Sequence, residues 1–230
     1  MKVDPKAHEL TPVPLGDSSR VVVGEPVAAI GSPFGNDSSL TVGVVSATQR
    51  SIASLTSSYD LVDAIQTDTQ INRGNSGGPL FDARGRVIGI NAQINSVSGN
   101  SEGVGFAVPI NSARRSMEQL IRSGEVRYAW LGVSTQTLTA ELAEHFGYPR
   151  REGAAVQTVV DGSPADEAGL RGGGDETEFT GIPFRPGGDL IVEIDGAPVH
   201  TAEDVVRAIT EQLFPGETTH LTVMRGTKAM

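Results

Sequence analysis

Short apolar runs alternate with polar or glycine-rich segments over the first 110 residues. This spacing is typical of short strands joined by tight turns, and it predicts a β-barrel or a β-sandwich. Apolar residues on both sides of Asp82–Gly85 indicate a hairpin over residues 79–94. The run at 21–30 is apolar enough for a buried strand. The other expected strands lie at residues 40–47, 61–71 and 103–109.

The pattern changes after residue 110. Asn111 and Ser112 can cap a helix with apolar residues at helical spacing, and Gly124 is a typical residue to end it. Strands and helices alternate from about residue 127 onward, which indicates a separate unit. We therefore expect two domains, residues 1–125 and 126–230. The second should hold strands at 130–133, 154–160, 190–194 and 221–224, and helices at 139–146, 163–170 and 201–213.

The composition fits a soluble globular protein, with 38% hydrophobic and 20% charged residues among 230. The net charge of −10 argues against nucleic acid as a partner, because phosphate binding needs a basic face. The absence of cysteine excludes disulfides, thiol catalysis and cysteine-based metal sites, and we expect neither a metal nor a cofactor. No apolar run is long enough to span a bilayer. The opening residues, MKVDPKAHEL, are expected to form the end of a strand and a loop rather than a signal peptide.

The candidate chemistry lies in RGNSGGPL, residues 73–80. In acyl transfer a serine attacks a carbonyl while nearby N–H groups hold the developing oxyanion. Gly74 gives the backbone freedom to aim its own N–H and that of Ser76 into one small site. Gly77 and Gly78 remove side chains that would obstruct a substrate. The alternative is a glycine-rich turn with an incidental serine.

The surrounding sequence strengthens the catalytic interpretation. Residues 65–91, IQTDTQINRGNSGGPLFDARGRVIGIN, resemble the nucleophile region of HtrA-type serine proteases, which are chymotrypsin-like. The second unit resembles the PDZ domain that follows the protease in this family, at WLGV, GSPADEAGL and GGDLIVEIDGAPV. Further matching segments lie at residues 15–35, 41–50 and 103–110, so nearly the whole chain is covered.

This resemblance implies a mainly β fold. The first unit would be the C-terminal half of a chymotrypsin-like double β-barrel, without the N-terminal barrel. A PDZ-like α+β domain with an incomplete last strand would follow. Residues 172–186 are extra to a compact PDZ pattern, and we expect them to form an acidic, glycine-rich mobile loop.

The resemblance also implies roles for single residues. Ser76 matches the nucleophile, and the N–H groups of Gly74 and Ser76 match the oxyanion hole, formed within the loop at 71–75. Residues 93–102 match a loop that shapes the substrate pocket, and Arg50 matches a regulatory loop. The substrate pocket is expected at Gln70, Asn75 and Phe106, with Ile94 and Val108 as further candidates for its walls or for the core. Peptide binding by the PDZ domain is expected at Leu131, Gly132 and Val133.

A neutral Gln70 in the pocket argues against a preference for lysine or arginine substrates. An apolar or small substrate residue is the expectation that the resemblance implies.

The chain departs from the family at the general base, because a serine nucleophile needs a histidine and an orienting carboxylate. His8 is expected in a solvated loop, and His145, His200 and His220 fall in the second unit. Asp63 and Asp68 are too close to the serine in sequence to match the family's aspartate. No base is assigned, and the chain alone is expected to be inactive.

The family resemblance implies an endopeptidase that acts on unfolded proteins outside the cytoplasm, in the periplasm or cell envelope. The partners it implies are unfolded protein or peptide substrates, and peptide C-termini at the PDZ groove. A homotrimeric full-length protein and a membrane anchor in a preceding segment are consistent with it. Two alternatives stay open at this point, a non-catalytic peptide-binding module and a pseudoprotease.

Overall fold

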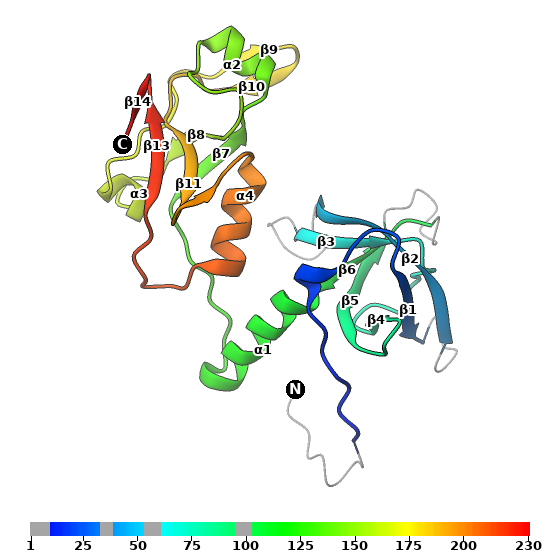
Figure 1. Ribbon diagram of the computed structural model, residues 1–230. Coiled ribbons are helices and arrows are strands. Elements are labelled where there is room, and N and C mark those ends of the chain that lie inside the picture. Colours follow the sequence, from blue (N-terminus) through cyan, green and yellow to red (C-terminus); the bar gives the residue numbers. More distant parts are fainter. Residues whose placement is uncertain (1–9, 33–38, 53–60, 95–102) are drawn as a thin grey trace. The chain divides into compact units, whose positions relative to one another are not determined.

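The computed structural model describes residues 10–32, 39–52, 61–94 and 103–230, and these form the mainly β fold that the sequence predicts (Figure 1). The chain divides into two compact units, Met1–Gly124 and Glu125–Met230. Each unit has its own buried hydrophobic clusters, so each is described by itself.

Six antiparallel strands of the first unit close into a barrel in the order β1-β2-β3-β6-β5-β4 (Figure 1). Closure comes from the pairing of β1 with β4, in which Ala28 lies opposite Phe81. The strands are β1 (Pro26–Gly31), β2 (Ser39–Ile52), β3 (Leu61–Thr67), β4 (Pro79–Asp82), β5 (Val87–Ile94) and β6 (Gly105–Pro109).

The barrel interior is filled by alternate apolar residues of these strands. On β1, Val27 and Ala29 point inward and are almost fully buried. Burying such a side chain contributes about 1.5–3 kcal/mol for a residue the size of valine or leucine. The buried cluster consists of Val27, Ala29, Val45, Ile65, Ile71, Leu80, Ile88 and Ala107.

The buried strand expected at 21–30 is only partly correct. β1 begins at Pro26, and Val22 and Val23 lie in the preceding turn with 57% and 62% of their surface exposed. Gly24 has a φ of 90° in this turn, and its N–H donates to the carbonyl of Val45. The positive φ ends the extended conformation, so the apolar run is a turn followed by a strand.

The helix α1 (Ile110–Ser123) ends the first unit at Gly124, as expected. Its beginning differs from the prediction, because neither Asn111 nor Ser112 is its N-cap. The cap comes instead from the distant 3₁₀ turn η1 (Ser18–Arg20), where the Ser18 hydroxyl accepts a hydrogen bond from the Asn111 N–H at 3.2 Å. The Asn111 side chain in turn donates to the Asp17 carboxylate at 2.9 Å.

The second unit contains a sheet of order β14-β13-β11-β8-β7, with β12 paired to β11. β7 therefore lies at a sheet edge. The strands and helices are β7 (Val133–Thr137), α2 (Ala140–Phe146), β8 (Ala154–Val159), α3 (Pro164–Glu167), β9 (Thr177–Phe179), β10 (Ile182–Phe184), β11 (Leu190–Ile194), β12 (Ala197–Pro198), α4 (Ala202–Arg207), the π-helical turn η3 (Ala208–Gln212), β13 (Leu221–Arg225) and β14 (Lys228–Ala229).

The expected strand at 130–133 is displaced toward the C-terminus. β7 begins at Val133, and Trp130 precedes it with 59% of its surface exposed. Trp130 therefore contributes little to the core.

Residues 172–186 form a hairpin rather than the mobile loop that was expected, because β9 pairs with β10. Thr180 and Gly181 both have positive φ, which matches the tight turns favoured in hairpins. Aromatic stacking holds the hairpin to α2: Phe179 stacks on His145 with ring centres 4.2 Å apart, and Phe184 stacks on Phe146 at 5.2 Å.

A buried ion pair joins the end of this hairpin region to β13. Asp189 is 1% exposed, and its carboxylate accepts hydrogen bonds from the Arg225 guanidinium at 2.7 and 2.8 Å and from the Arg171 N–H at 2.8 Å. The hydrogen bond to Asp189 raises the pKa of Arg225 above its ordinary value. Because a buried carboxylate is costly without partners, this geometry ties β11, β13 and the segment after α3 together.

The charge on Asp17 offers a test of the long-range cap. Hydrogen bonds from Asn111 and then from Ser19 lower the pKa of Asp17 from 3.8 to about 2. The carboxylate therefore stabilises the fold above its ordinary pKa, and this contribution is lost as the pH falls from 3.8 toward 2. Asn111→Ala should raise the pKa of Asp17 toward 3.8, as measured by an NMR titration of the carboxyl carbon. An ordinary pKa in the unaltered protein would contradict the cap.

The buried ion pair predicts a large stability difference. Asp189→Asn should lower the free energy of unfolding of the second unit by about 3 kcal/mol, because the Arg225 guanidinium loses its charged partner. Urea unfolding followed by the fluorescence of Trp130, the single tryptophan, measures this loss. Glu125→Gln, which breaks the exposed pair with Arg127, is the matched control and should cost less than about 1 kcal/mol. Equal losses in both variants would contradict the structural role of Asp189.

Candidate functional site

Ser76 lies in the segment that joins Ile71 to β4, and residues 71–78 are called the serine loop below. The loop begins with a turn in which the Asn75 N–H donates to the carbonyl of Asn72 at 3.0 Å. Gly74, the third residue of this turn, has a φ of 104°, whereas the φ of Arg73 is not positive. A positive φ at this position alone is the mark of a type II turn, which favours glycine there.

A second turn follows directly. The N–H of Gly78 donates to the carbonyl of Asn75 at 2.9 Å, and Gly77, again the third residue, has a φ of 83°. Ser76 is the second residue of this turn. The spacing of Gly74 and Gly77 in the sequence therefore reflects two consecutive type II turns that share Asn75, the second of which contains the serine.

The third glycine is needed for a different reason. A Cβ on Gly78 would lie 2.2 Å from the carbonyl oxygen of Ile30, so no side chain fits there. The same loop is fastened to β5, where the N–H of Gly77 donates to the Asn91 carbonyl and the Asn91 N–H donates to the Gly78 carbonyl, both at 2.8 Å. The serine loop thus packs directly on the backbone of β1 and β5.

The Ser76 side chain is exposed, and its hydroxyl donates to the carbonyl of Ala92 at 2.9 Å. The N–H groups of Gly74 and Ser76 donate to no other group within residues 10–32, 39–52, 61–94 and 103–230. Two N–H groups without partners on both sides of Asn75 are what an oxyanion-binding site requires. Sequence reasoning did not foresee Ala92, and nothing in the sequence marks its carbonyl as the acceptor.

The described part of the unit that holds Ser76 contains no histidine that could act as its base. His8, the histidine of the first unit, lies outside that part. Each histidine of the second unit has a partner there. His145 stacks on Phe179, His200 Nδ1 lies 3.0 Å from a Glu152 oxygen, and His220 Nδ1 lies 3.6 Å from an Asp195 oxygen.

The two aspartates near the serine in sequence lie within β3 and directly after it. The Asp68 carboxylate accepts a hydrogen bond from the Val44 N–H at 2.7 Å, which holds β2 to the segment after β3. Asp63 lies within β3 and has a φ of 58°.

The predicted pocket residues lie in different environments. Gln70 is exposed, whereas Asn75 and Phe106 are buried, with 1% and 4% of their surface exposed. Val108 is half-buried on β6, and the side chain of Ile94 and residues 95–102 lie outside the described part. The side chain of Asn75 therefore does not lie at the surface. Its amide nitrogen donates a hydrogen bond of 3.1 Å to the main-chain carbonyl of Gln70.

Arg50 is exposed near the end of β2. Its guanidinium Nε donates to the Gln66 side chain on β3 at 3.0 Å. The contact links two neighbouring strands of the barrel, and residues 53–60, which follow, lie outside the described part.

The second unit offers a similar pair of backbone donors before its edge strand. The carbonyls of Leu131 and Gly132 accept hydrogen bonds from the N–H groups of Ala165 at 2.9 Å and Val160 at 2.8 Å. The N–H groups of Leu131 and Gly132 have no acceptor in the described chain. Gly132 has a φ of 81°, and a Cβ there would lie 2.1 Å from the Cβ of Ser163.

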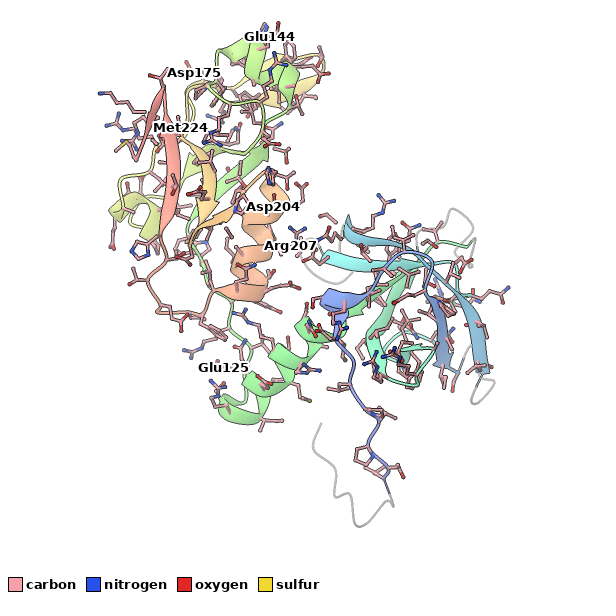
Figure 2. The ribbon with its side chains drawn as sticks, viewed as in Figure 1. Glu125, Glu144, Asp175, Asp204, Arg207 and Met224 are labelled. Carbon is pink, nitrogen blue, oxygen red and sulfur yellow. The ribbon has the colours of Figure 1, made fainter. Side chains whose placement is uncertain are left out.

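The helix α4 lies beside this edge strand. The Thr137 hydroxyl at the end of β7 accepts from the Ala202 N–H at 2.9 Å and donates to Glu203 at 3.0 Å. Figure 2 labels Asp204 and Arg207 on α4. Asp204 accepts from the N–H of Thr201 at 2.9 Å in a capping box, which fixes where the helix begins.

Other features of the described residues do not add to these sites. No group of three or more His, Asp or Glu side chains in the described ranges could hold a metal ion. No described helix is long and apolar enough to cross a membrane. A cavity of about 320 Å³ in the first unit contains no residue of the serine loop. Its charged lining is Asp17, Arg20, Glu25, Asp82, Arg84 and Arg86.

The fold and the two donor sites define a class of protein, a trypsin-like peptidase unit followed by a PDZ unit. Comparison with family models agrees: a trypsin-like peptidase domain matches residues 1–90, and a PDZ domain matches residues 129–230.

The relatives that match this chain show which kind of trypsin-like peptidase it resembles. A probable periplasmic serine endoprotease DegP-like from Marinomonas sp. (strain MWYL1) is 48% identical over 185 residues, which are 80% of this chain and 39% of the relative. A protein of the same description from Brucella suis biovar 1 (strain 1330) is 38% identical over 229 residues, covering 100% of this chain and 41% of the relative. The chain thus spans about two fifths of these relatives.

Solved structures point to the same family. The structure described as HtrA-type protease AlgW with decapeptide matches with a TM-score of 0.73 and 36% identity, over 95% of this chain and 61% of that one. The serine endoprotease from Yersinia pestis matches with a TM-score of 0.63 and 28% identity, over 100% of this chain and 66% of that one. This chain belongs to the HtrA-type family of serine proteases, as the sequence predicted.

Proposed function

We propose that this protein is a serine endopeptidase that cleaves unfolded proteins through an acyl-enzyme on Ser76. The observation that supports it best is an exposed serine hydroxyl beside the N–H groups of Gly74 and Ser76, which have no acceptor among the described residues. In this proposal the Ser76 hydroxyl attacks the substrate carbonyl, and the two N–H groups hold the oxyanion that forms.

We propose that the 230 residues contain neither the general base nor the orienting carboxylate, because the described part of the first unit holds no histidine and neither Asp63 nor Asp68 matches the family's aspartate. The 230-residue chain by itself is therefore proposed to be catalytically incompetent. Loss of a triad member typically lowers kcat by several powers of ten, and the oxyanion hole alone retains only slight activity.

Substrate selection is proposed to depend on the neutral, exposed Gln70, with Asn75 and Phe106 behind it. A pocket without a carboxylate favours apolar or small substrate residues over lysine or arginine. Arg50 is proposed to belong to a regulatory loop, and its hydrogen bond to Gln66 would connect that loop to β3. The protein is proposed to act in the periplasm or cell envelope, as the names of its relatives say of them, and to form homotrimers at full length.

A second activity is proposed for the second unit, the binding of peptide C-termini. The edge position of β7 allows an extended peptide to add as a further strand, and in this proposal the N–H groups of Leu131 and Gly132 receive its carboxylate. Val133 would supply the first backbone pair of this added strand. A protein in which this unit alone is active would be a peptide-binding module with a passive barrel.

The peptidase proposal is tested with the full-length gene product and unfolded casein. Ser76→Ala should abolish cleavage, because no other side chain can replace the nucleophile. Gly74→Ala should lower kcat by about 10²–10³-fold, because the strained turn no longer presents its N–H to the oxyanion. Cleavage that survives Ser76→Ala would refute the proposal.

The 230-residue chain serves as the control in the same assay. It should cleave casein no faster than its Ser76→Ala variant. Robust cleavage that depends on Ser76 would show that the chain supplies its own base, and His8 would then be the residue to replace next.

Peptide binding is tested by calorimetry with apolar C-terminal peptides that carry either a free carboxylate or an amide. The free acid should bind at least about tenfold more tightly, because hydrogen bonds to a charged group are stronger than those to a neutral one. Gly132→Ala should weaken binding of the free acid, since an alanine cannot occupy this position without moving Ser163. Equal affinities for both peptides would count against carboxylate recognition.

A further inference from the structure

The side chain of Asn75 is buried although both of its neighbours are exposed. It is 1% exposed, whereas Gly74 and Ser76 face solvent. Its amide nitrogen donates to the carbonyl of Gln70 at 3.1 Å, and its amide oxygen is buried without a hydrogen-bond partner in the described chain. A buried polar side chain with only one of its groups satisfied is costly, so a specific benefit is expected from the hydrogen bond that it does make.

The barrel leaves room for this side chain at one glycine. A Cβ on Gly31, at the end of β1, would lie 2.4 Å from the Asn75 amide oxygen and 2.6 Å from the Asn75 Cα. The φ of Gly31 is not positive, so its conformation is open to other residues. Glycine is therefore required at position 31 by the space that the Cα and side chain of Asn75 occupy, not by the φ of Gly31 itself.

The acceptor of the Asn75 amide is itself held in place. The Gln70 carbonyl also accepts a hydrogen bond from the Thr41 hydroxyl on β2 at 3.2 Å. On the other side of the turn, the N–H of Ser32 donates to the Gly74 carbonyl at 3.1 Å. The turn Asn72–Asn75 is thus fastened to the barrel at its third residue by the main chain and at its fourth by the Asn75 side chain.

We propose that Asn75 is a positioning residue, whose side-chain amide holds the turn Asn72–Asn75 in its type II form. A type I turn differs from type II by a rotation of the peptide between the two central residues, here Arg73 and Gly74. That rotation would turn the Gly74 N–H away from the place it has in this structure. The consequence for catalysis rests on the proposed peptidase function, whereas the effect on the turn does not.

The chemistry at position 75 explains why an amide suits it and a carboxylate does not. The group that faces the Gln70 carbonyl must donate a hydrogen bond, and asparagine donates through its NH₂ group. An ionised aspartate of the same shape would place two acceptors against each other. When protonated it could donate again, so Asn75→Asp should make the turn dependent on pH.

Asn91 on β5 provides a matched control. It is also 1% exposed, its amide donates to the Pro79 carbonyl at 3.3 Å, and its amide oxygen likewise has no partner in the described chain. Its side chain makes no hydrogen bond to the turn Asn72–Asn75. Replacing it removes a comparable buried amide without releasing that turn.

NMR on the 230-residue chain distinguishes directly between the type I and type II forms of the turn Asn72–Asn75. In a type II turn, ψ near +120° at the second residue brings its Hα close to the next N–H, so the cross-peak between Arg73 Hα and Gly74 HN should be strong. We expect this cross-peak in the unaltered chain and in Asn91→Ala. It should be lost in Asn75→Ala at every pH. In Asn75→Asp it should be lost at neutral pH and recovered when the introduced carboxyl is protonated.

An unchanged cross-peak in Asn75→Ala, or in Asn75→Asp across the whole pH range, would overturn the proposal. So would its absence from the unaltered chain. If the variants at position 75 do not fold, Gly31→Ala provides the same test, because its new methyl group displaces the Asn75 amide without removing it. A folded Gly31→Ala with a strong cross-peak would then overturn the proposal.

A second measurement separates this proposal from the peptidase function. A peptidyl boronic acid with an apolar first residue should bind at Ser76 in the full-length gene product, and its affinity should fall at least about tenfold in Asn75→Ala but not in Asn91→Ala. Failure of the unaltered full-length protein to bind the boronic acid would refute the role of Ser76. The cross-peak would still decide whether Asn75 holds the turn.

Discussion

The serine loop rests on the end of β1 at a distance that no side chain would allow. A Cβ at Gly78 would meet the Ile30 carbonyl, and one at Gly31 would meet Asn75. This close approach depends on the pairing of β1 with β4, which closes the barrel directly beside the loop. The shape of the serine loop therefore depends on barrel closure. A change that loosens the pairing of β1 with β4 would also move Ser76.

The two units resemble each other in how they leave backbone N–H groups free to bind an anion. At Gly74 and at Gly132, a glycine with positive φ has its carbonyl held by an N–H from elsewhere, Ser32 in one case and Val160 in the other. The N–H groups nearby have no acceptor in the described chain. The Ser76 N–H shares its peptide group with the Asn75 carbonyl, which accepts from the Gly78 N–H, and the Gly132 N–H shares its own with the Leu131 carbonyl, which accepts from the Ala165 N–H. A peptide group held at its oxygen cannot easily rotate, so these two N–H groups are fixed before any anion arrives. Such preorganisation is what makes backbone donors effective toward developing or bound negative charge.

Much of this could be predicted from the sequence, because it depends on local patterns. The barrel strands follow from alternating apolar residues, and the glycines around Ser76 indicated the turn. What was missed depends on contacts between distant residues. The inward side chain of Asn75 depends on Gly31, and the start of α1 depends on Ser18. The hairpin at 172–186 was missed for another reason. Its glycine and acidic residues favour a loop, and they outweighed the pattern that indicates a hairpin, namely Phe179 and Phe184 on either side of Thr180-Gly181.

The cap of α1 also constrains the order in which the first unit folds. The Ser18 hydroxyl and the Asn111 N–H that it caps are 93 positions apart in the chain. Starting a helix is its most costly step, and closing so long a loop adds further entropy. The first turn of α1 cannot draw on this cap until η1 has reached its place on the barrel. We therefore expect α1 to gain its full protection against hydrogen exchange only after the barrel has formed, although its sequence favours a helix from the start.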